Sequence, residues 1–147
     1  MTKEVIAVKK DEPIKNVFKL MDKHGILGVP VLNEEEAVVG IVTESDLIQH
    51  FTRLERPLGV NILGSLVYLS DIQDFNENLK DHCAEKVGDM MTKDPVTIME
   101  NYTLQQCINT MTEEGVSRLP VVDEVGKLVG IVTRKDIVHQ IAKFKTI

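Results

Sequence analysis

The chain has 147 residues, of which 43% are apolar, and a formal net charge of -6. This length fits one ordinary domain or two very small ones, and the acidic balance without a Lys/Arg-rich run argues against nucleic-acid binding, which depends on phosphate neutralisation. No apolar run approaches the roughly 20 residues of a membrane span, and the N-terminus lacks the apolar stretch of a signal peptide. We therefore expect a cytoplasmic protein that makes no membrane contact.

The cysteines and histidines follow no pattern typical of a metal site. Cys83 and Cys107 are too few for a disulfide framework, and the four histidines lie far apart in the sequence. A structural zinc site needs four ligands in close pairs. We therefore expect no metal and no cofactor, and we expect both thiols to be buried or half-buried.

The sequence contains an internal duplication. Residues 2–51 align without a gap with residues 92–141. The identical pairs include Met21 and Met111, Gly25 and Gly115, Pro30 and Pro120, and Asp46 and Asp136. Because Gly, Pro and Asp stay in register over fifty residues, the alignment predicts two copies of one unit related by a pseudo-twofold axis.

Each copy is expected to open with a short strand and an amphipathic helix. The strands are predicted at residues 5–8 and 96–99. In the first copy Asp11 can cap the helix, and Pro13 occupies a position where a missing N–H costs little. Gly25 and Gly115 follow the last helical residues, as left-handed caps do.

A hairpin and a second helix complete each copy. "VPVLN" and "AVVGIVT" flank the turn "EEE", and "LPVVD" and "KLVGIVT" flank "EVG". These β-branched runs around turn residues predict antiparallel strand pairs, and helices should begin after Thr43 and Thr133. The expected fold class is α+β, with two β-α-β-β-α units that share a core.

An insertion separates the two copies. The predicted domains are repeat 1 at residues 1–55, a helical insertion at 56–85 and repeat 2 at 86–147. Pro57 should stop the preceding helix, and a new helix should be capped by Ser70 or Asp71. The run "NILGSLVYL" could pack against a partner subunit or within the chain, and the sequence leaves both readings open.

The repeated "GIVTESD" and "GIVTRKD" carry the chemistry of interest. A Thr at the end of a strand and an Asp three residues later surround a helix N-terminus, whose unpaired N–H groups and dipole attract anions. The Asp can accept hydrogen bonds from both hydroxyls of a ribose. A single Thr-x-x-Asp is more often only a capping pattern, so the residues alone leave a ligand site and a plain cap open.

The two stretches "GILGVPVLNEEEAVVGIVTESD" and "GVSRLPVVDEVGKLVGIVTRKD", with "VGDMMTKDPVTI" before the second, resemble a tandem pair of CBS domains, named for cystathionine β-synthase. The resemblance covers about residues 1–55 and 86–145. It implies a regulatory module that binds AMP, ADP, ATP or S-adenosylmethionine in clefts between the repeats and that forms a homodimer.

The resemblance also implies residue roles. Asp46 and Asp136 correspond to the ribose-binding carboxylates, and Thr43 and Thr133 to the hydroxyls near the phosphate. One cleft would combine Thr43 and Asp46 with an adenine wall made by Thr97, Val116, Ser117, Arg118 and Pro120. The other would combine Thr133, Arg134 and Asp136 with Ala7, Ile26, Leu27 and Pro30.

The two predicted clefts differ in charge. Arg118 corresponds to Gly28, and Arg134 corresponds to Glu44. Because cations near a phosphate form charge-assisted hydrogen bonds, the Asp136 cleft should be the better site for a phosphorylated ligand. The Asp46 cleft depends on Arg118, and Glu44 should limit it to a monophosphate or an uncharged adenosine moiety.

The sequence therefore favours a regulatory sensor of adenine nucleotides or related adenosyl ligands that acts on an unidentified partner protein. A ligand-independent dimerisation scaffold is the alternative. An enzyme is not expected, because no acid/base pair, nucleophile or metal cluster accompanies the two repeated acids.

Overall fold

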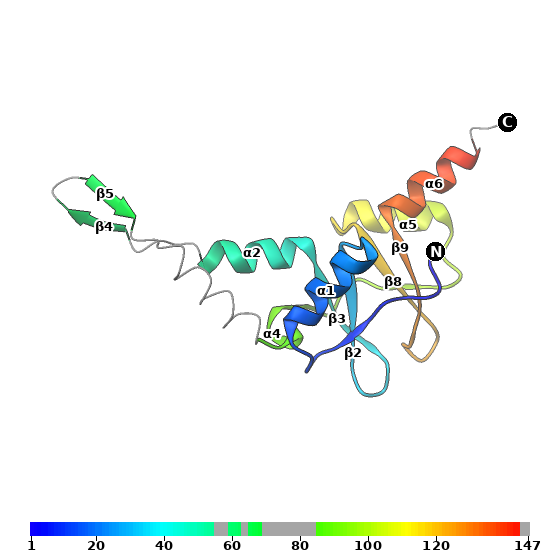
Figure 1. The fold of residues 1–147 in the computed structure, drawn as a ribbon. Coiled ribbons are helices and arrows are strands. Elements are labelled where there is room, and N and C mark those ends of the chain that lie inside the picture. Colours follow the sequence, from blue (N-terminus) through cyan, green and yellow to red (C-terminus); the bar gives the residue numbers. More distant parts are fainter. Residues whose placement is uncertain (55–58, 63–64, 69–84, 145–147) are drawn as a thin grey trace.

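A computed structural model describes residues 1–54, 59–62, 65–68 and 85–144, with side chains for 1–50 and 85–144. Two small sheets with their helices lie side by side (Figure 1). The first repeat contains β1 (Val8–Lys9), α1 (Ile14–His24), β2 (Gly28–Leu32), β3 (Val38–Thr43) and α2 (Glu44–Leu54). The second contains β7 (Ile98–Met99), α5 (Leu104–Glu113), β8 (Arg118–Val122), β9 (Leu128–Thr133) and α6 (Arg134–Phe144). The predicted β-α-β-β-α units are confirmed.

Strand register repeats between the two halves. β1 pairs in parallel with β2, and β2 pairs antiparallel with β3; β7, β8 and β9 do the same. Gly28 lies opposite Thr43, and Arg118 lies opposite Thr133 at the same position of the second hairpin. Each hairpin also shifts register before its outermost pair, at Leu32 and at Val122. The duplication seen in the sequence is therefore preserved down to the strand irregularities.

Several predicted helix and strand ends need correction. β1 and β7 contain two residues each, fewer than the predicted 5–8 and 96–99. Asp11 does not cap α1: Pro13 is the N-cap, no side chain caps it, and the Ile14 amide donates to the Glu85 carbonyl at 2.7 Å. The acceptor comes from a distant segment, which local sequence does not reveal. Gly25 and Gly115 have φ of 60° and 65°, so the predicted left-handed caps are confirmed.

Each repeat builds its own apolar core. In the first, Val17, Val29, Val31 and Val42 are fully buried between the sheet and α1. In the second, the corresponding layer contains Leu119, Val121, Ile98 and Cys107. Burial raises the pKa of the Cys107 thiol, because a thiolate would lose its hydration there. The predicted burial of Cys107 is confirmed, whereas Cys83 lies outside the described residues.

The two repeats exchange edge segments. β6 (Thr92–Lys93), from the lead-in to the second repeat, pairs antiparallel with β3 of the first. In return, the Thr2 backbone pairs with Ile131 of β9, with both N···O distances at 3.0 Å. The short helix α4 (Val87–Met90) places Val87 in the core of the first repeat. Each half therefore completes the sheet of the other.

The described part of the insertion is a hairpin. β4 (Gly59–Ile62) pairs antiparallel with β5 (Ser65–Tyr68). The expected helical insertion did not anticipate these strands, although β-branched residues such as Val60, Ile62 and Val67 favour extended backbone. The helix predicted from Ser70 and the stop at Pro57 lie outside the described residues, as do the side chains of "NILGSLVYL". The described part of α2 spans Glu44–Leu54.

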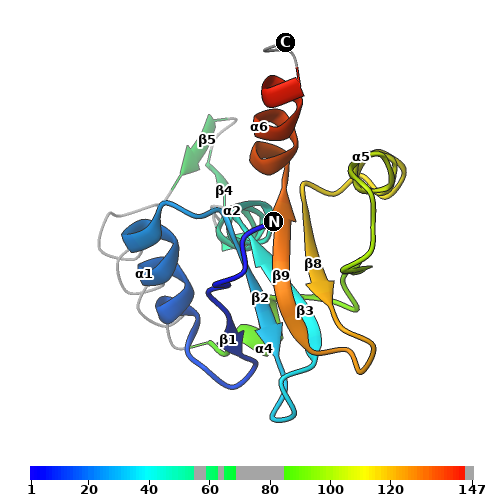
Figure 2. The same cartoon turned by 90° about the vertical axis from the view of Figure 1, so that its right-hand side faces the viewer.

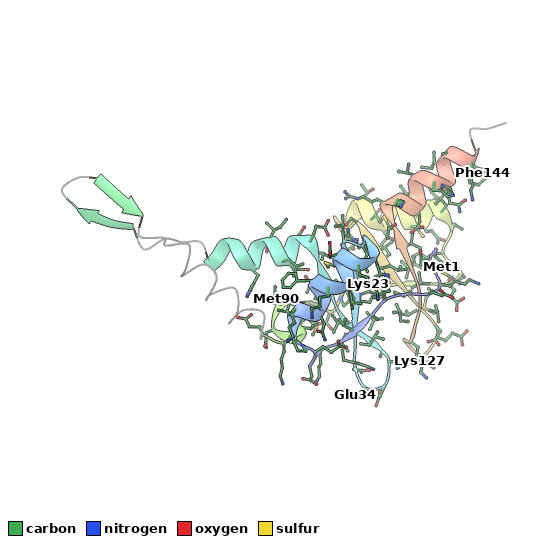
Figure 3. The ribbon with its side chains drawn as sticks, in the orientation of Figure 1. Met1, Lys23, Glu34, Met90, Lys127 and Phe144 are labelled. Carbon is green, nitrogen blue, oxygen red and sulfur yellow. The ribbon has the colours of Figure 1, made fainter. Side chains whose placement is uncertain are left out.

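The hairpin turns and the helices α2 and α6 lie at opposite ends of the sheets. Figure 2 shows the two hairpin turns together at one end and α6 continuing beyond the other end of β9. Figure 3 labels Glu34 and Lys127 on the two turns and Phe144 at the far end of α6. Across the described ranges, no helix has the length and apolar character to cross a bilayer.

Candidate functional site

The two Thr-x-x-Asp turns lie where a strand passes directly into a helix. β3 ends at Thr43 and α2 begins at the next residue, and β9 passes into α6 in the same way. Asp46 and Asp136 are therefore first-turn residues of their helices. In Figure 2, α6 begins at the end of β9 opposite the hairpin turn. Both carboxylates are half-buried.

Each Asp is held by its own Thr. Asp46 Oδ2 accepts hydrogen bonds from the Thr43 amide at 2.8 Å and from its hydroxyl at 2.9 Å. Asp136 Oδ2 accepts from the Thr133 amide and hydroxyl, both at 2.8 Å, and the Asp136 amide donates to Thr133 Oγ1 at 3.3 Å. The turns are thus genuine caps. Their geometry fixes Oδ2 and leaves Oδ1 as the oxygen that a ligand could approach.

The helix amides are less available to an anion than the sequence suggests. The Glu44 amide donates to the Leu27 carbonyl, and the Arg134 amide donates to the Ser117 carbonyl, both at 3.1 Å. The prediction that these first-turn N–H groups are unpaired was wrong, because the start of the neighbouring strand supplies an acceptor in each repeat. An anion at either turn would therefore depend more on side-chain cations than on these backbone donors.

Asp46 has a further partner that the sequence reasoning missed. The Thr92 hydroxyl, on β6, donates to Asp46 Oδ1 at 2.9 Å. Thr2 is the repeat counterpart of Thr92, yet in the described part of the chain no hydroxyl makes the equivalent contact to Asp136. The matching "MTKE" and "MTKD" were the available signal, but only the exchanged edge strands show why Thr92 matters.

Arg118 spans the two repeats. Its Nη1 lies 3.0 Å from Glu44 Oε2, and its Nη2 donates to Glu44 Oε1 at 3.3 Å. Nη1 also donates to the Ser117 hydroxyl at 2.9 Å. The Arg118 side chain is only 11% exposed, and that of Glu44 is 37% exposed. The predicted association of Arg118 with the first turn of the other repeat is therefore seen, but an internal carboxylate already occupies the guanidinium.

Gly28 makes room for this arrangement. A Cβ at Gly28 would lie 2.5 Å from Arg118 Cδ and 2.8 Å from Arg118 Nε. Gly28 and Arg118 hold the same position in the two repeats, so the contact crosses the pseudo-twofold axis. The first repeat has no side chain at this position because the Arg118 side chain of the second repeat fills the space.

The predicted adenine-wall residues fall into three groups by exposure. Ala7, Thr97, Ile26, Val116 and Ser117 are half-buried, which leaves part of their surface accessible. Leu27 is 57% exposed. Pro30 and Pro120 are fully buried within β2 and β8, so they expose almost no surface to a ligand. Direct ligand contact by these two prolines does not fit the structure.

The second predicted site, around Asp136, has a more exposed first-turn residue than the first site. Arg134 is exposed, whereas Glu44 at the equivalent position is half-buried in its pair with Arg118. No hydrogen bond or ion pair among the described side chains joins Ala7, Ile26 or Leu27 to Asp136. Over the same residues, no group of three His, Cys, Asp or Glu side chains is placed to hold a metal ion.

Comparison with known proteins identifies the repeats. The CBS domain family matches residues 1–53 and 87–143. An uncharacterized protein of Methanocaldococcus jannaschii is 34% identical over 145 residues, which span 93% of this chain and 86% of that protein. The inosine-5'-monophosphate dehydrogenase of the same organism is 29% identical over 94% of this chain, but the match spans only 22% of the enzyme.

The fold is shared with a solved CBS-pair structure. CBSX2 of Arabidopsis thaliana, crystallised in complex with AMP, superposes with a TM-score of 0.73 at 25% identity, over 99% of this chain and 94% of that one. The matched repeats, their register and this superposition agree on one assignment. The chain belongs to the CBS domain family, as a tandem pair.

Proposed function

We propose that this protein is a regulatory module that binds an adenine nucleotide or a related adenosyl ligand between its two repeats. The observation that carries the proposal is the pair of first-turn carboxylates, Asp46 and Asp136, each fixed through Oδ2 by its own Thr. A carboxylate held in this way keeps acceptor capacity on Oδ1 for a ribose hydroxyl without losing its position. The AMP complex of CBSX2 supports the choice of ligand class.

The two proposed sites follow the combinations given by the sequence. The first site contains Thr43, Asp46, Thr97, Val116, Ser117 and Arg118. The second contains Ala7, Ile26, Leu27, Thr133, Arg134 and Asp136. Cross-repeat assembly of the first site is supported by the Arg118–Glu44 pair. Ligand contacts drawn from both repeats would couple occupancy to their relative position, which is how such a module could influence a partner protein.

A regulatory role is favoured over a catalytic one. The resemblance to inosine-5'-monophosphate dehydrogenase is confined to 22% of that enzyme. Each acid in the repeated turns accepts hydrogen bonds from the amide and hydroxyl of its own Thr, an arrangement that suits the binding of a ligand hydroxyl. The partner protein and a cytoplasmic location remain predictions from the sequence.

We also propose that the module is a homodimer. Ile48 on α2 and Val138 on α6 hold the same repeat position and are 64% and 67% exposed. Ile141 and Phe144 extend the α6 surface, at 41% and 69% exposed. Apolar side chains at equivalent places on both helices suit a second copy of the chain, which would present the same faces.

Thermal unfolding with a ligand panel tests the proposed function. AMP, ADP, ATP, S-adenosylmethionine and adenosine would each be added to the protein, with GMP as a control for the base. A ligand that binds only the native state must raise the midpoint, by an amount that grows with ligand concentration. At a hundredfold excess over Kd the stabilisation is about 2.7 kcal/mol. An unchanged midpoint with every adenine ligand would favour the alternative, a ligand-independent dimerisation scaffold.

A further inference from the structure

The ion pair between Arg118 and Glu44 places an anion of the protein against the cation of the Asp46 site. Both guanidinium Nη atoms are engaged, at 3.0 and 3.3 Å, and the Arg118 side chain is mostly buried. A guanidinium fork recognises a carboxylate and a phosphate with the same two-pronged geometry. A ligand phosphate that approached the Nη1–Nη2 face of Arg118 would therefore compete with the Glu44 carboxylate for that face.

The pseudo-twofold axis supplies an internal comparison. At the Asp136 site the position of Glu44 is taken by Arg134, and the position of Arg118 is taken by Gly28. Glu44 thus has no acidic counterpart at this position, and Arg134 and Lys135 are exposed. The two sites share the Thr–Asp turn but differ in whether the cation is already neutralised.

A second contact also acts on the Asp46 site alone. Thr92 donates to Asp46 Oδ1, so this carboxylate uses both oxygens within the protein. One further acceptor position on Oδ1 is left for a ligand hydroxyl, since a carboxylate oxygen has two lone pairs. The Asp46 site can still bind a ribose, but Arg118, the cation that the described residues bring to this site, is already paired with Glu44.

We propose that Glu44 determines ligand specificity as a built-in competitor for Arg118. The Asp46 site then selects an adenosyl ligand without a phosphate, and the Asp136 site accepts the phosphorylated ligand. This inference rests on the proposed function, because it assigns a ligand class to each of its two sites. It makes Glu44 a positioning and specificity residue, whose removal should improve the binding of one ligand and leave the other unchanged.

A site-resolved titration tests the proposal. The backbone amides of Ser45 and Lys135, which are equivalent positions in α2 and α6, would report on the two sites by NMR as AMP or adenosine is added. The two ligands differ only in the phosphate. In Glu44→Gln the amide oxygen can still accept from Arg118, but the competing charge is gone. We expect the affinity for AMP at the Ser45 reporter to rise about tenfold, or about 1.4 kcal/mol. The affinity for adenosine at the same reporter should change by less than twofold.

Two control variants isolate the mechanism. Glu35→Gln makes the same charge change on the exposed β2–β3 turn and should leave both affinities within twofold. Arg118→Met keeps an unbranched side chain over Gly28 but removes the cation, so adding Glu44→Gln to it should give no gain for AMP. The affinities for AMP and adenosine measured at the Lys135 reporter should stay at their wild-type values in all of these variants.

The possible outcomes separate the inference from the proposed function. If both ligands bind and Glu44→Gln leaves the ratio of their affinities at the Ser45 reporter unchanged, the inference is overturned and the proposed function stands. The inference is also overturned if Glu44→Gln still raises the affinity for AMP when Arg118 is replaced by Met. If neither ligand shifts either reporter in the wild type or in Glu44→Gln, the specificity role is overturned. The proposed function fails as well only if the rest of the ligand panel also leaves the unfolding midpoint unchanged.

Discussion

At the scale of single residues, Thr43 and Thr133 hold the acids that the ligand would meet. Each Thr hydroxyl donates a hydrogen bond to the Oδ2 atom of its Asp. A Thr that donates in this way cannot also donate to a phosphate unless it releases the Asp. The Thr side chains are therefore better understood as positioning the carboxylates than as the phosphate contacts that the family resemblance implies.

Substitution of the two acids by Asn should separate their roles. Asn keeps an oxygen that can accept from the Thr amide, so the cap is largely retained, but it loses the charge. Because hydrogen bonds to charged groups contribute about 1.5–3 kcal/mol, we expect Asp136→Asn to weaken AMP binding at the Lys135 reporter by about tenfold or more. Asp46→Asn should weaken adenosine binding at the Ser45 reporter. Undiminished affinity in both variants would rule out the ribose assignment.

The contacts that distinguish the two sites were the part that the sequence could not predict. The Thr-x-x-Asp turns were recognisable because the Thr and the Asp lie only three positions apart in the sequence. Thr92 and Asp46 are 46 positions apart, and Arg118 and Glu44 are 74 apart. Such pairs depend on how the repeats pack, so the sequence could indicate repulsion by Glu44 but not its bonding to Arg118.

At the scale of elements, helices and hairpins were predicted where local signals were strong. The glycine caps and the β-branched hairpins both appear as expected. The start of α1 was predicted wrongly because Asp11 looked like a cap, whereas the helix takes its acceptor from Glu85. By contrast, α5 carries a full capping box between Thr103 and Gln106.

The exposed apolar positions of α2 and α6 give a test of the homodimer. Burial of a large aliphatic side chain contributes about 1.5–3 kcal/mol, and a carboxylate there would be desolvated without a partner. We expect the double variant Ile48→Glu, Val138→Glu to remain folded by circular dichroism but to show half the wild-type mass by light scattering. Gln49→Glu with His139→Glu, at the next position of each helix, is the matched control and should stay dimeric. If the first pair also keeps the wild-type mass, these faces are not the interface.

At the scale of the whole molecule, the exchanged segments tie the halves together. β6 of the second repeat extends the sheet of the first, Thr2 pairs with β9, and Val87 enters the first core. Neither half can lose its structure without exposing backbone hydrogen-bonding groups or apolar surface of the other. A ligand that changes the relative position of the repeats must therefore act on one connected framework.

This framework predicts that both repeats unfold in a single transition. Ile14 lies in the core of the first repeat at 1% exposure and Leu119 in that of the second at 0%. Replacement of either by Ala should cost about 2–5 kcal/mol and lower the midpoint of the whole transition, because the repeats unfold together. Calorimetry should give one peak in each variant, and amide exchange in β8 should accelerate in Ile14→Ala as it does in Leu119→Ala. Two separate peaks, with the second repeat melting at its wild-type temperature in Ile14→Ala, would mean that the exchanged segments do not couple the repeats. In that case occupancy of one site could not be transmitted through them to the other.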